Sequence, residues 1–248
     1  MSGSGSTSDH LDIGGVFDRT GEIYQSAFGT FWLVALVLLV PAAVIQWILG
    51  DGALGHFLGS VVQLIAGAWL AGSVVRIVQD VEASGDIDYT LGEFLGAVWP
   101  RLLAIIVLQF LIGIMVAIGL FFLIIPGVII ALILAVSLPS LVVEDAGVFE
   151  SMSRSAELTK DNRMRILAVG ILVILIVFGI AALVVLLGAI TPLIGALVGL
   201  VLGILLYPYL AMLETVLYFR LVELKEGGVV AVEETVVVEE DAGPPPAV

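Results

Sequence analysis

The sequence contains no cysteine and only two histidines, His10 and His56, among its 248 residues. Without cysteine the chain forms no disulfide, holds no thiolate-bound metal and has no cysteine nucleophile. A metal site needs several converging donors, and His56 stands alone between apolar segments while His10 lies in a short polar stretch. We therefore expect no metal site and no cofactor.

Charged residues are also scarce, at 13% of the chain against about 25% in soluble domains. Hydrophobic residues make up 60%, and the mean hydropathy is +1.20. The formal net charge of −14 arises from acids in the tails and connecting segments, so it describes only the parts in contact with water. This composition indicates a membrane protein, with membrane lipids as partners and no nucleic-acid partner.

Two kinds of signature are absent. The first residues, MSGSGSTSDH, are small and polar rather than basic followed by an apolar core, so we expect no cleaved secretory signal. The chain has no H-E-x-x-H, no G-x-S-x-G and no G-x-x-x-x-G-K-[ST] pattern. We therefore expect a protein that is not an enzyme.

Long apolar runs are what the sequence has in abundance, and a bilayer span takes about 20 predominantly apolar residues. We expect six spans joined as three hairpins: Phe28–Leu49, Phe57–Val78, Leu102–Phe122, Ile124–Val143, Ile166–Leu187 and Ile190–Leu213. Pro139 lies inside the fourth span and predicts a kink, as Pro41 and Pro208 do in the first and sixth. The predicted fold class is all-α, a polytopic integral membrane protein.

All nine basic residues flank these spans on one side: Arg19, Arg76, Arg101, Arg154, Lys160, Arg163, Arg165, Arg220 and Lys225. The loops on the other side, around residues 51–56, 123–126 and 188–192, contain no Lys or Arg. Basic residues are retained on the cytoplasmic side. We therefore expect a multi-pass protein of the cell membrane with both termini in the cytoplasm.

Short amphipathic segments precede the first, third and fifth spans. Their apolar stripes are Ile13, Phe17, Thr20 and Tyr24, then Leu91, Phe94, Leu95 and Val98, then Phe149, Met152 and Ala156. Each segment carries a glutamate (Glu22, Glu93 and Glu157), and TLGE at residues 90–93 has the pattern of a capping box. We expect three interfacial helices, each followed by a two-helix hairpin. Residues 12–225 form the membrane domain, and residues 1–11 and 226–248 are expected to be disordered tails.

Small residues recur at helical spacing in two spans. The rows are Gly55, Gly59 and Gly67, with Gln63 between them, and Gly195, Gly199 and Gly203. Such rows let helix backbones approach closely in lipid, so we interpret them as packing faces. A glycine-lined path for a solute is the alternative. For Gln46, Gln63 and Gln109 we expect hydrogen bonds between helices rather than contact with a substrate.

No ionisable residue falls at the mid-depth of any predicted span, where a charge is costly. Glu214 comes nearest, about 35 Å along the sixth span at 1.5 Å per residue. We interpret it as an interfacial acid near Arg220 or Arg76, with a proton or cation relay as the alternative. Glu144 and Asp145 are adjacent, so on a helix they diverge by about 100°. Their role stays open.

Four of the nine basic residues lie within positions 154–165, just inside the fourth span: Arg154, Lys160, Arg163 and Arg165. The simplest interpretation is that they set the orientation and pair locally with Glu157 and Asp161. Our hypothesis is that the cluster also binds anionic lipid headgroups, since a basic residue near an anionic leaflet contributes about 1 kcal/mol.

Three features together resemble a known family: VFDRTGEIYQSAFGTF, the stretch from FFLIIPG to DNRMRIL at residues 121–167, and the six-span layout. They are similar to the membrane domain attached to some bacterial glycerophosphoryl diester phosphodiesterases and to related stand-alone bacterial and archaeal membrane proteins. The likeness covers roughly residues 13–225. In that family the hydrolase chemistry belongs to a separate soluble barrel, for which this chain has no room. The resemblance therefore implies a membrane module and transfers no catalytic residue.

Three functions remain open at this point. The one we favour is a non-enzymatic membrane protein that organises lipids or a partner membrane protein at the cytoplasmic face. The second is a transporter or permease-like protein for an apolar or amphiphilic solute, which an accessible cavity at mid-depth would support. The third is a lipid-processing enzyme, which requires Glu144, Asp145 and Glu214 to converge. The oligomeric state is not predicted.

Overall fold

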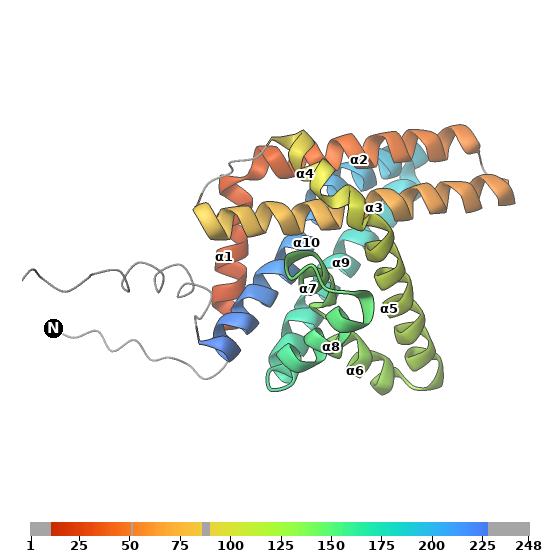
Figure 1. Ribbon diagram of the computed structural model, residues 1–248. Coiled ribbons are helices and arrows are strands. Elements are labelled where there is room, and N and C mark those ends of the chain that lie inside the picture. Colours follow the sequence, from red (N-terminus) through yellow and green to blue (C-terminus); the bar gives the residue numbers. More distant parts are fainter. Residues whose placement is uncertain (1–10, 51, 86–89, 228–248) are drawn as a thin grey trace, which may run out of the picture.

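The computed structural model describes residues 11–50, 52–85 and 90–227, so the expected tails at residues 1–10 and 228–248 lie outside the described residues. Within these ranges the chain is helical and contains no strand. The elements are α1 (Ile13–Ser26), α2 (Phe28–Leu49), α3 (Ala53–Ser84), α4 (Leu91–Val98), the 3₁₀ turn η1 (Trp99–Arg101), α5 (Leu102–Phe122), α6 (Ile124–Ile133), α7 (Ser137–Val143), α8 (Val148–Thr159), α9 (Arg163–Ile190) and α10 (Pro192–Glu226) (Figure 1).

Six helical segments of this part of the chain are long and apolar enough to cross a membrane, which confirms the predicted fold class. They are α2, α3, α4 to α5, α6 to α7, α9 and α10. Four of them are longer than predicted, and the longest single helices among them are the two central ones, since α3 has 32 residues and α10 has 35. At 1.5 Å per residue each exceeds the roughly 30 Å of hydrocarbon, so their final turns extend into the polar interface.

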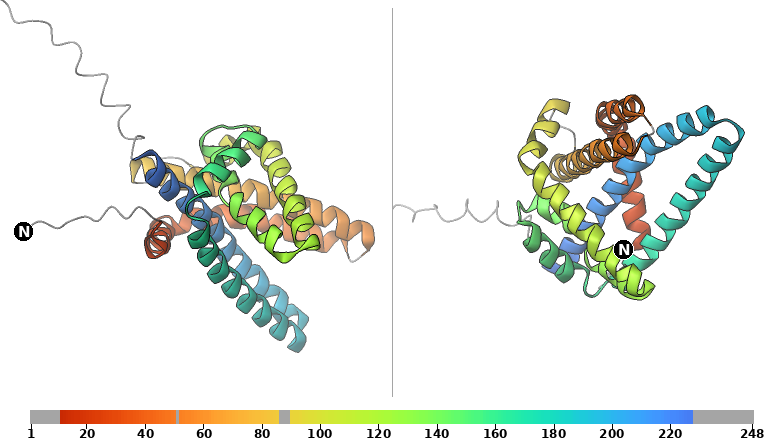
Figure 2. Two further views of the ribbon diagram at one scale, coloured as in Figure 1. Left: turned by 90° about the horizontal axis from the view of Figure 1, so that it is seen from below. Right: turned by 90° about the vertical axis from the view of Figure 1, so that its right-hand side faces the viewer.

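The helices α3 and α10 form the centre of the molecule. One buried cluster joins α1, α2, α3 and α10 and includes Phe31, Leu70, Ile77 and Met212. A second joins α3 to α5 and α7 through Val75, Ile105, Leu141 and their neighbours. Helix α1 lies across α10, and the α9–α10 hairpin projects away from the other two hairpins (Figures 1 and 2).

Each hairpin is closed by a glycine near its turn. A Cβ atom added at Gly55 would lie 2.4 Å from the carbonyl oxygen of Leu49, and one added at Gly119 would lie 2.7 Å from the Cα of Gly127. At Gly195 the same construction meets the Cα of Gly188 at 2.5 Å. Distances this short leave no room for a side chain, so these positions allow backbones to touch.

The predicted fourth span is broken into α6 and α7 at residues 134–136. Pro139 explains the break, because its ring clashes with the carbonyl of the fourth residue before it and it has no N–H to donate. Helix α8 supplies the missing hydrogen bonds: the Ser155 hydroxyl donates to the carbonyl of Ile133 at 2.8 Å and accepts from the N–H of Val136 at 3.2 Å. The freed backbone groups are therefore satisfied inside the protein.

The three short amphipathic helices α1, α4 and α8 precede α2, α5 and α9, as predicted. The capping box at the start of α4 is also confirmed, with the Glu93 carboxylate accepting from the Thr90 N–H at 2.7 Å. The predicted stripe of α8 holds at Met152, which packs against the second cluster, but not at Phe149, which is 77% exposed. The buried face of α8 consists of Ser151, Ser155, Leu158 and Thr159. Satisfying the α6–α7 break turns the serine face inward and the phenylalanine outward.

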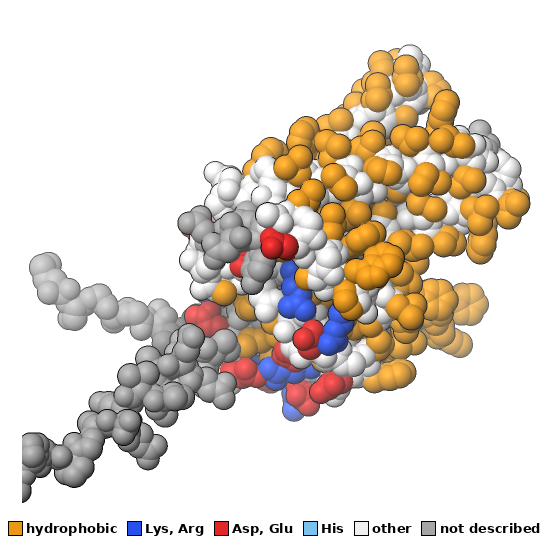
Figure 3. Space-filling model, turned by 45° about the horizontal axis from the view of Figure 1, so that its top comes forward, with side chains coloured by type: hydrophobic (Ala, Val, Ile, Leu, Met, Phe, Trp, Pro, Cys, Tyr) orange, Lys and Arg blue, Asp and Glu red, His pale blue; other side chains and the backbone are white. Residues whose placement is uncertain are grey.

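Acidic and basic side chains gather at one end of the molecule, where both described chain ends also lie, and the rest of the visible surface is largely apolar (Figure 3). We call this region, which contains the ion pairs Arg19–Glu82, Arg101–Asp145 and Arg154–Glu226, the charged end. Leu11, expected as the last tail residue, is buried there, and its N–H donates to the Asn162 side chain at 3.0 Å. Glu226, expected to begin the second tail, ends α10 and pairs with Arg154. The membrane domain thus extends one residue further in each direction than predicted.

Candidate functional site

A cavity of about 520 Å³ lies between α2, α3, α5 and α10. Its lining includes Leu39 of α2, Gly67 of α3 and Gly203 of α10. Each of these residues falls near the middle of the apolar run of its helix, so the cavity sits at mid-depth of the membrane domain. Its size lies within the range of about 300–1,000 Å³ that is typical of small-molecule sites.

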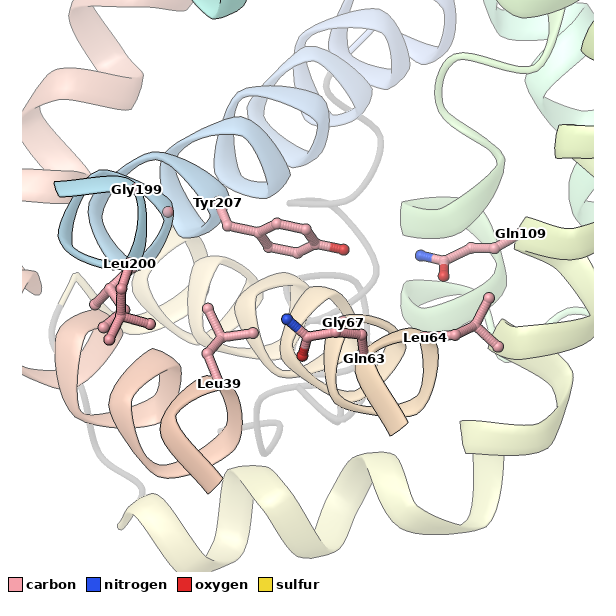
Figure 4. A pocket seen from close by; sticks show the side chains of 10 residues that line it. Leu39, Gln63, Leu64, Gly67, Gln109, Gly199, Leu200 and Tyr207 are labelled. Carbon is pink, nitrogen blue, oxygen red and sulfur yellow. The ribbon is translucent and has the colours of Figure 1, made fainter. Parts of the chain in front are cut away.

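Three polar side chains reach this otherwise apolar cavity: Gln63 of α3, Gln109 of α5 and Tyr207 of α10. The tyrosine hydroxyl and the Gln109 amide point toward one another, and Gln63 rises from α3 beside them (Figure 4). None of the three has a hydrogen-bond partner among the described residues, although Gln63 and Gln109 were expected to bond between helices. Their hydrogen-bonding groups are therefore available to whatever occupies the cavity.

Glycines make the space for these side chains. A Cβ atom added at Gly67 would lie only 2.9 Å from the Tyr207 hydroxyl, so a side chain at this position would displace the tyrosine. Gly199 and Gly203 line the cavity from α10. A Cβ atom at Gly199 would approach Val184 at 3.3 Å, whereas at Gly203 nothing in the described part of the chain lies within 4 Å. Gly203 was expected in a packing face and instead borders open space.

The remaining glycines of the two rows lie in close helix contacts. Gly55 and Gly195 are at hairpin turns, as described above, and a Cβ atom at Gly59 would overlap the Gln46 side chain of α2 at 1.6 Å. The α3 row thus changes role along its length, from packing against α2 to lining the cavity at Gly67.

Two further hollows continue from this cavity along α10. A small one of about 160 Å³ shares Gln109 and Tyr207 with it. A groove of about 420 Å³ between α6, α9 and α10 shares Leu210 and Glu214 with the small hollow. The groove is lined by aliphatic side chains apart from Glu214, and Ile171 and Ile174 on its α9 wall are half exposed. The groove therefore opens onto the apolar surface that α9 presents to the bilayer.

Glu214 is partly buried at the junction of the small hollow and the groove. The expected proximity to Arg220 or Arg76 is not found: Arg220 pairs with Glu223 at 2.7 Å, and Arg76 pairs with Asp145 at 3.3 Å. Arg220 is six residues further along the helix, about 600° of rotation, and so lies on another face. No ion pair to Glu214 exists among the described residues.

The adjacent acids Glu144 and Asp145 diverge, as their spacing predicts. The carboxylate of Glu144 accepts from Arg154 at 2.9 Å and from the Tyr218 hydroxyl at 2.8 Å. Asp145 has a left-handed backbone, with φ of 54°, and pairs with Arg101 at 3.0 Å and with Arg76. The two carboxylates thus bind separate sets of arginines and tie the end of α7 to α3, η1, α8 and α10. Neither of them lines the hollows that contain Glu214.

The four basic residues at positions 154–165 divide into two pairs. Arg154 binds Glu144 and Glu226, and Arg165 donates to the carbonyl of Leu11, so both hold the fold together. Lys160 is exposed, and neither it nor Arg163 forms an ion pair within 4 Å among the described residues. The Nε of Arg163 is buried without a hydrogen-bond partner in this part of the chain. Asp161, expected to pair with the cluster, pairs with Lys225 at 3.0 Å.

These contacts shift two pKa values at the charged end. Partial burial by itself lowers the pKa of Arg154, but its hydrogen bonds to Glu144 and Glu226 outweigh that effect and raise the pKa above its ordinary value. The hydrogen bond from Lys225 lowers the pKa of the exposed carboxyl of Asp161. Both groups are therefore charged at neutral pH.

Sequence reasoning missed Tyr207 as a cavity residue, although a signal was present. Tyr207 continues the four-residue spacing of Gly195, Gly199 and Gly203, as Gln63 does between Gly59 and Gly67. Each row therefore carries a polar side chain in line with its glycines. That pattern indicates a helix face that borders free space. A face that packs against another helix would have small residues at every one of these positions.

Comparison with known proteins places the chain in a family. No solved structure matches it. The resemblance to the membrane domain of glycerophosphoryl diester phosphodiesterases stays an expectation, because the family match shows no link to those proteins. That match covers residues 55–222, from the start of α3 almost to the end of α10. It includes the whole lining of the groove and every lining residue of the cavity except Leu39 of α2. The chain belongs to the uncharacterised protein family UPF0259.

Proposed function

We propose that this chain is a non-enzymatic, permease-like membrane protein that binds an amphiphilic solute in the mid-depth cavity. The observation that carries the proposal is the convergence of Gln63, Gln109 and Tyr207 on open space without protein partners. An unsatisfied amide or hydroxyl away from water costs about 1–3 kcal/mol. A solute with hydrogen-bonding groups recovers that energy, whereas a purely apolar one does not.

The shape of the cavity supports the same proposal over a purely organising role. Its walls are aliphatic and its polar groups few and grouped, which is the usual character of sites for small molecules. Gly199 and Gly203 keep the α10 wall open. A scaffold that acts only through its surface gains nothing from space at this depth, since each void forfeits packing contacts.

A second candidate function is binding of anionic lipid headgroups at the charged end. It is favoured by Lys160 and Arg163, which lie beside the α8–α9 turn without ion pairs of their own in the described structure. Of the four basic residues that were expected from the sequence to bind headgroups, two remain as candidates in this proposal. The lipid-processing enzyme loses support, because Glu144 and Asp145 are held by different arginines and neither lines the hollows that contain Glu214.

Photo-crosslinking tests the proposed function. We expect a long-chain alcohol carrying a diazirine to label the purified protein at residues that line the cavity, among them Leu39 and Leu200. Gly203→Phe places a ring in the cavity and should lower this labelling at least fivefold. Gly179→Phe is the matched control, because a Cβ atom at Gly179 on α9 also meets nothing within 4 Å of the described structure, yet Gly179 does not line the cavity.

Equal labelling of Gly203→Phe and Gly179→Phe, with both variants monodisperse in detergent, would contradict a solute site in the cavity. Labelling spread evenly over the lipid-facing helices of the parent protein would contradict it as well.

A further inference from the structure

We propose that Glu214 binds the ammonium group of a cationic, single-chain amphiphile, whose alkyl chain lies in the groove between α6, α9 and α10. This inference rests on the proposed function and names the class of solute. It starts from a carboxylate that the described structure leaves without a cation, in a groove that is otherwise aliphatic.

In the described part of the chain, no basic residue lines the surroundings of Glu214 on the elements packed against it. The groove is lined from α6, α9 and α10 by aliphatic residues, and the small hollow adds Gln109 of α5, Leu138 of α7 and Tyr207 of α10. Neither lining includes Lys, Arg or His. The nearby arginines at the charged end are held by Asp145, Glu144, Glu226 and Glu223.

The position of Glu214 explains why a cation is the fitting ligand. Glu214 lies one helical turn before Tyr218, whose hydroxyl reaches Glu144 at the charged end. It is thus about 6 Å deeper along α10 than the last ion-paired layer. A carboxylate removed from water is stabilised by an opposite charge close to it. A ligand that carries an ammonium group supplies that charge, and an uncharged or anionic head does not.

The groove also explains why the ligand is an amphiphile. An alkyl chain gains little by moving from lipid to an aliphatic groove, because lipid tails are equally apolar. The head group of the ligand therefore determines which amphiphile binds, and Glu214 is the residue of the groove that can distinguish head groups. The open α9 wall at Ile171 and Ile174 allows a chain to enter sideways from the bilayer.

The hollows between this site and the mid-depth cavity adjoin one another through shared lining residues. Leu210 and Glu214 border both the groove and the small hollow, and Gln109 and Tyr207 border both the small hollow and the cavity. A head group at Glu214 thus lies in the hollow that also contains Gln109 and Tyr207, the hydrogen-bonding groups deeper in the membrane. The structure assigns to the groove the entry position and to the cavity the interior position of one path.

Two photoreactive probes of equal chain length, a diazirine-bearing primary amine and the corresponding alcohol, test the assignment on the full-length protein in lipid nanodiscs. In the parent protein the amine should label the groove, at residues such as Leu167 and Ile171, at least fivefold more than the alcohol does. E214Q should reduce amine labelling there to the alcohol level and leave alcohol labelling of the cavity unchanged. E214D restores the carboxylate and should recover at least half of the amine labelling.

E223Q is the matched control, because Glu223 lies on the same helix but is exposed and pairs with Arg220. Equal amine labelling of E214Q and E223Q would overturn the assignment, and so would a parent protein that labels equally with amine and alcohol. The proposed function fails separately, when the alcohol does not label the cavity in any variant. The two failures are therefore distinguishable in one set of samples.

Discussion

At the scale of single residues, the charged end shows that a basic residue near a membrane need not face the lipid. Arg154 and Arg165 were predicted to bind headgroups together with Lys160 and Arg163, yet their guanidinium groups hold Glu144, Glu226 and the backbone of Leu11. A guanidinium in a bidentate or shared contact is occupied. We therefore propose that Lys160 and Arg163, rather than all four residues, would bind anionic lipid.

The double variant Lys160→Gln/Arg163→Gln tests this division. Each basic residue near an anionic surface contributes about 1 kcal/mol, so the double variant should weaken retention of phosphatidylglycerol in native mass spectra by roughly 30-fold. High salt should weaken retention by the parent protein in the same direction. Arg154 and Arg165 stay in place and preserve the fold and the local positive charge.

The control removes the same number of charges elsewhere. Arg19→Gln/Arg220→Gln neutralises two arginines that pair with Glu82 and Glu223, and should retain lipid as the parent protein does. If Lys160→Gln/Arg163→Gln also retains lipid like the parent, the basic residues at positions 154–165 have orientation and internal pairing as their roles.

At the scale of elements, helix α8 supplies the hydrogen bonds that the broken fourth span lacks. The gap between α6 and α7 leaves the Ile133 carbonyl and the Val136 N–H without helical partners, and Ser155 binds both. The hydroxyl of Thr159 also donates to the Ile133 carbonyl, at 3.4 Å. The break caused by Pro139 and the serine face of α8 are thus parts of one arrangement.

Ser155→Ala should lower the free energy of unfolding by about 1–3 kcal/mol, since it leaves the buried Val136 N–H unsatisfied. Reversible unfolding in mixed detergent micelles measures the change. Ser153→Ala on the exposed face of the same helix is the control and should unfold like the parent protein. A Ser155→Ala protein as stable as Ser153→Ala would show that water or Thr159 satisfies the break equally well.

The same element shows where sequence reasoning ends. Apolar run length predicted all six spans, because lipid demands about 20 apolar residues whatever the neighbouring helices do. Pro139 predicted the disruption of the fourth span for an equally local reason. The buried face of α8 was not predictable from its own pattern, because it is set by hydrogen-bonding groups on another helix and not by hydrophobicity.

The cavity escaped prediction for a related reason. Gln63, Gln109 and Tyr207 lie on three helices, and their convergence depends on how each helix is rotated about its axis. Uniformly apolar spans carry almost no signal for that rotation, since lipid-facing and buried faces have similar composition. The spacing of Tyr207 from the α10 glycines was the available signal. The glycine row was interpreted as a packing face, with a glycine-lined path as the alternative, and Tyr207 was not included in it.

At the scale of the whole molecule, the structure brings together basic residues that are distant in the sequence. Arg76 and Arg101 meet at Asp145, Arg154 meets Glu226 at the end of α10, and Arg19 pairs with Glu82 near the end of α3. The adjoining ends of α2 and α3, of α5 and α6 and of α9 and α10 lie away from the charged end (Figures 1 and 2). One end of the molecule thus carries the positive charge that determines membrane orientation.

This asymmetry predicts that the charged end lies in the cytoplasm, and the absence of cysteine makes the test clean. Single cysteines at Gly52, Ala189 and Ser153 occupy exposed positions, the first two at hairpin turns and the third on α8 at the charged end. In intact cells of an expression host, a membrane-impermeant maleimide should label Gly52→Cys and Ala189→Cys and spare Ser153→Cys. Permeabilised cells serve as the control, in which Ser153→Cys should react too. Reaction of Ser153→Cys in intact cells, with Gly52→Cys protected, would mean that the molecule is inserted the other way, and Lys160 and Arg163 would then face the outer leaflet.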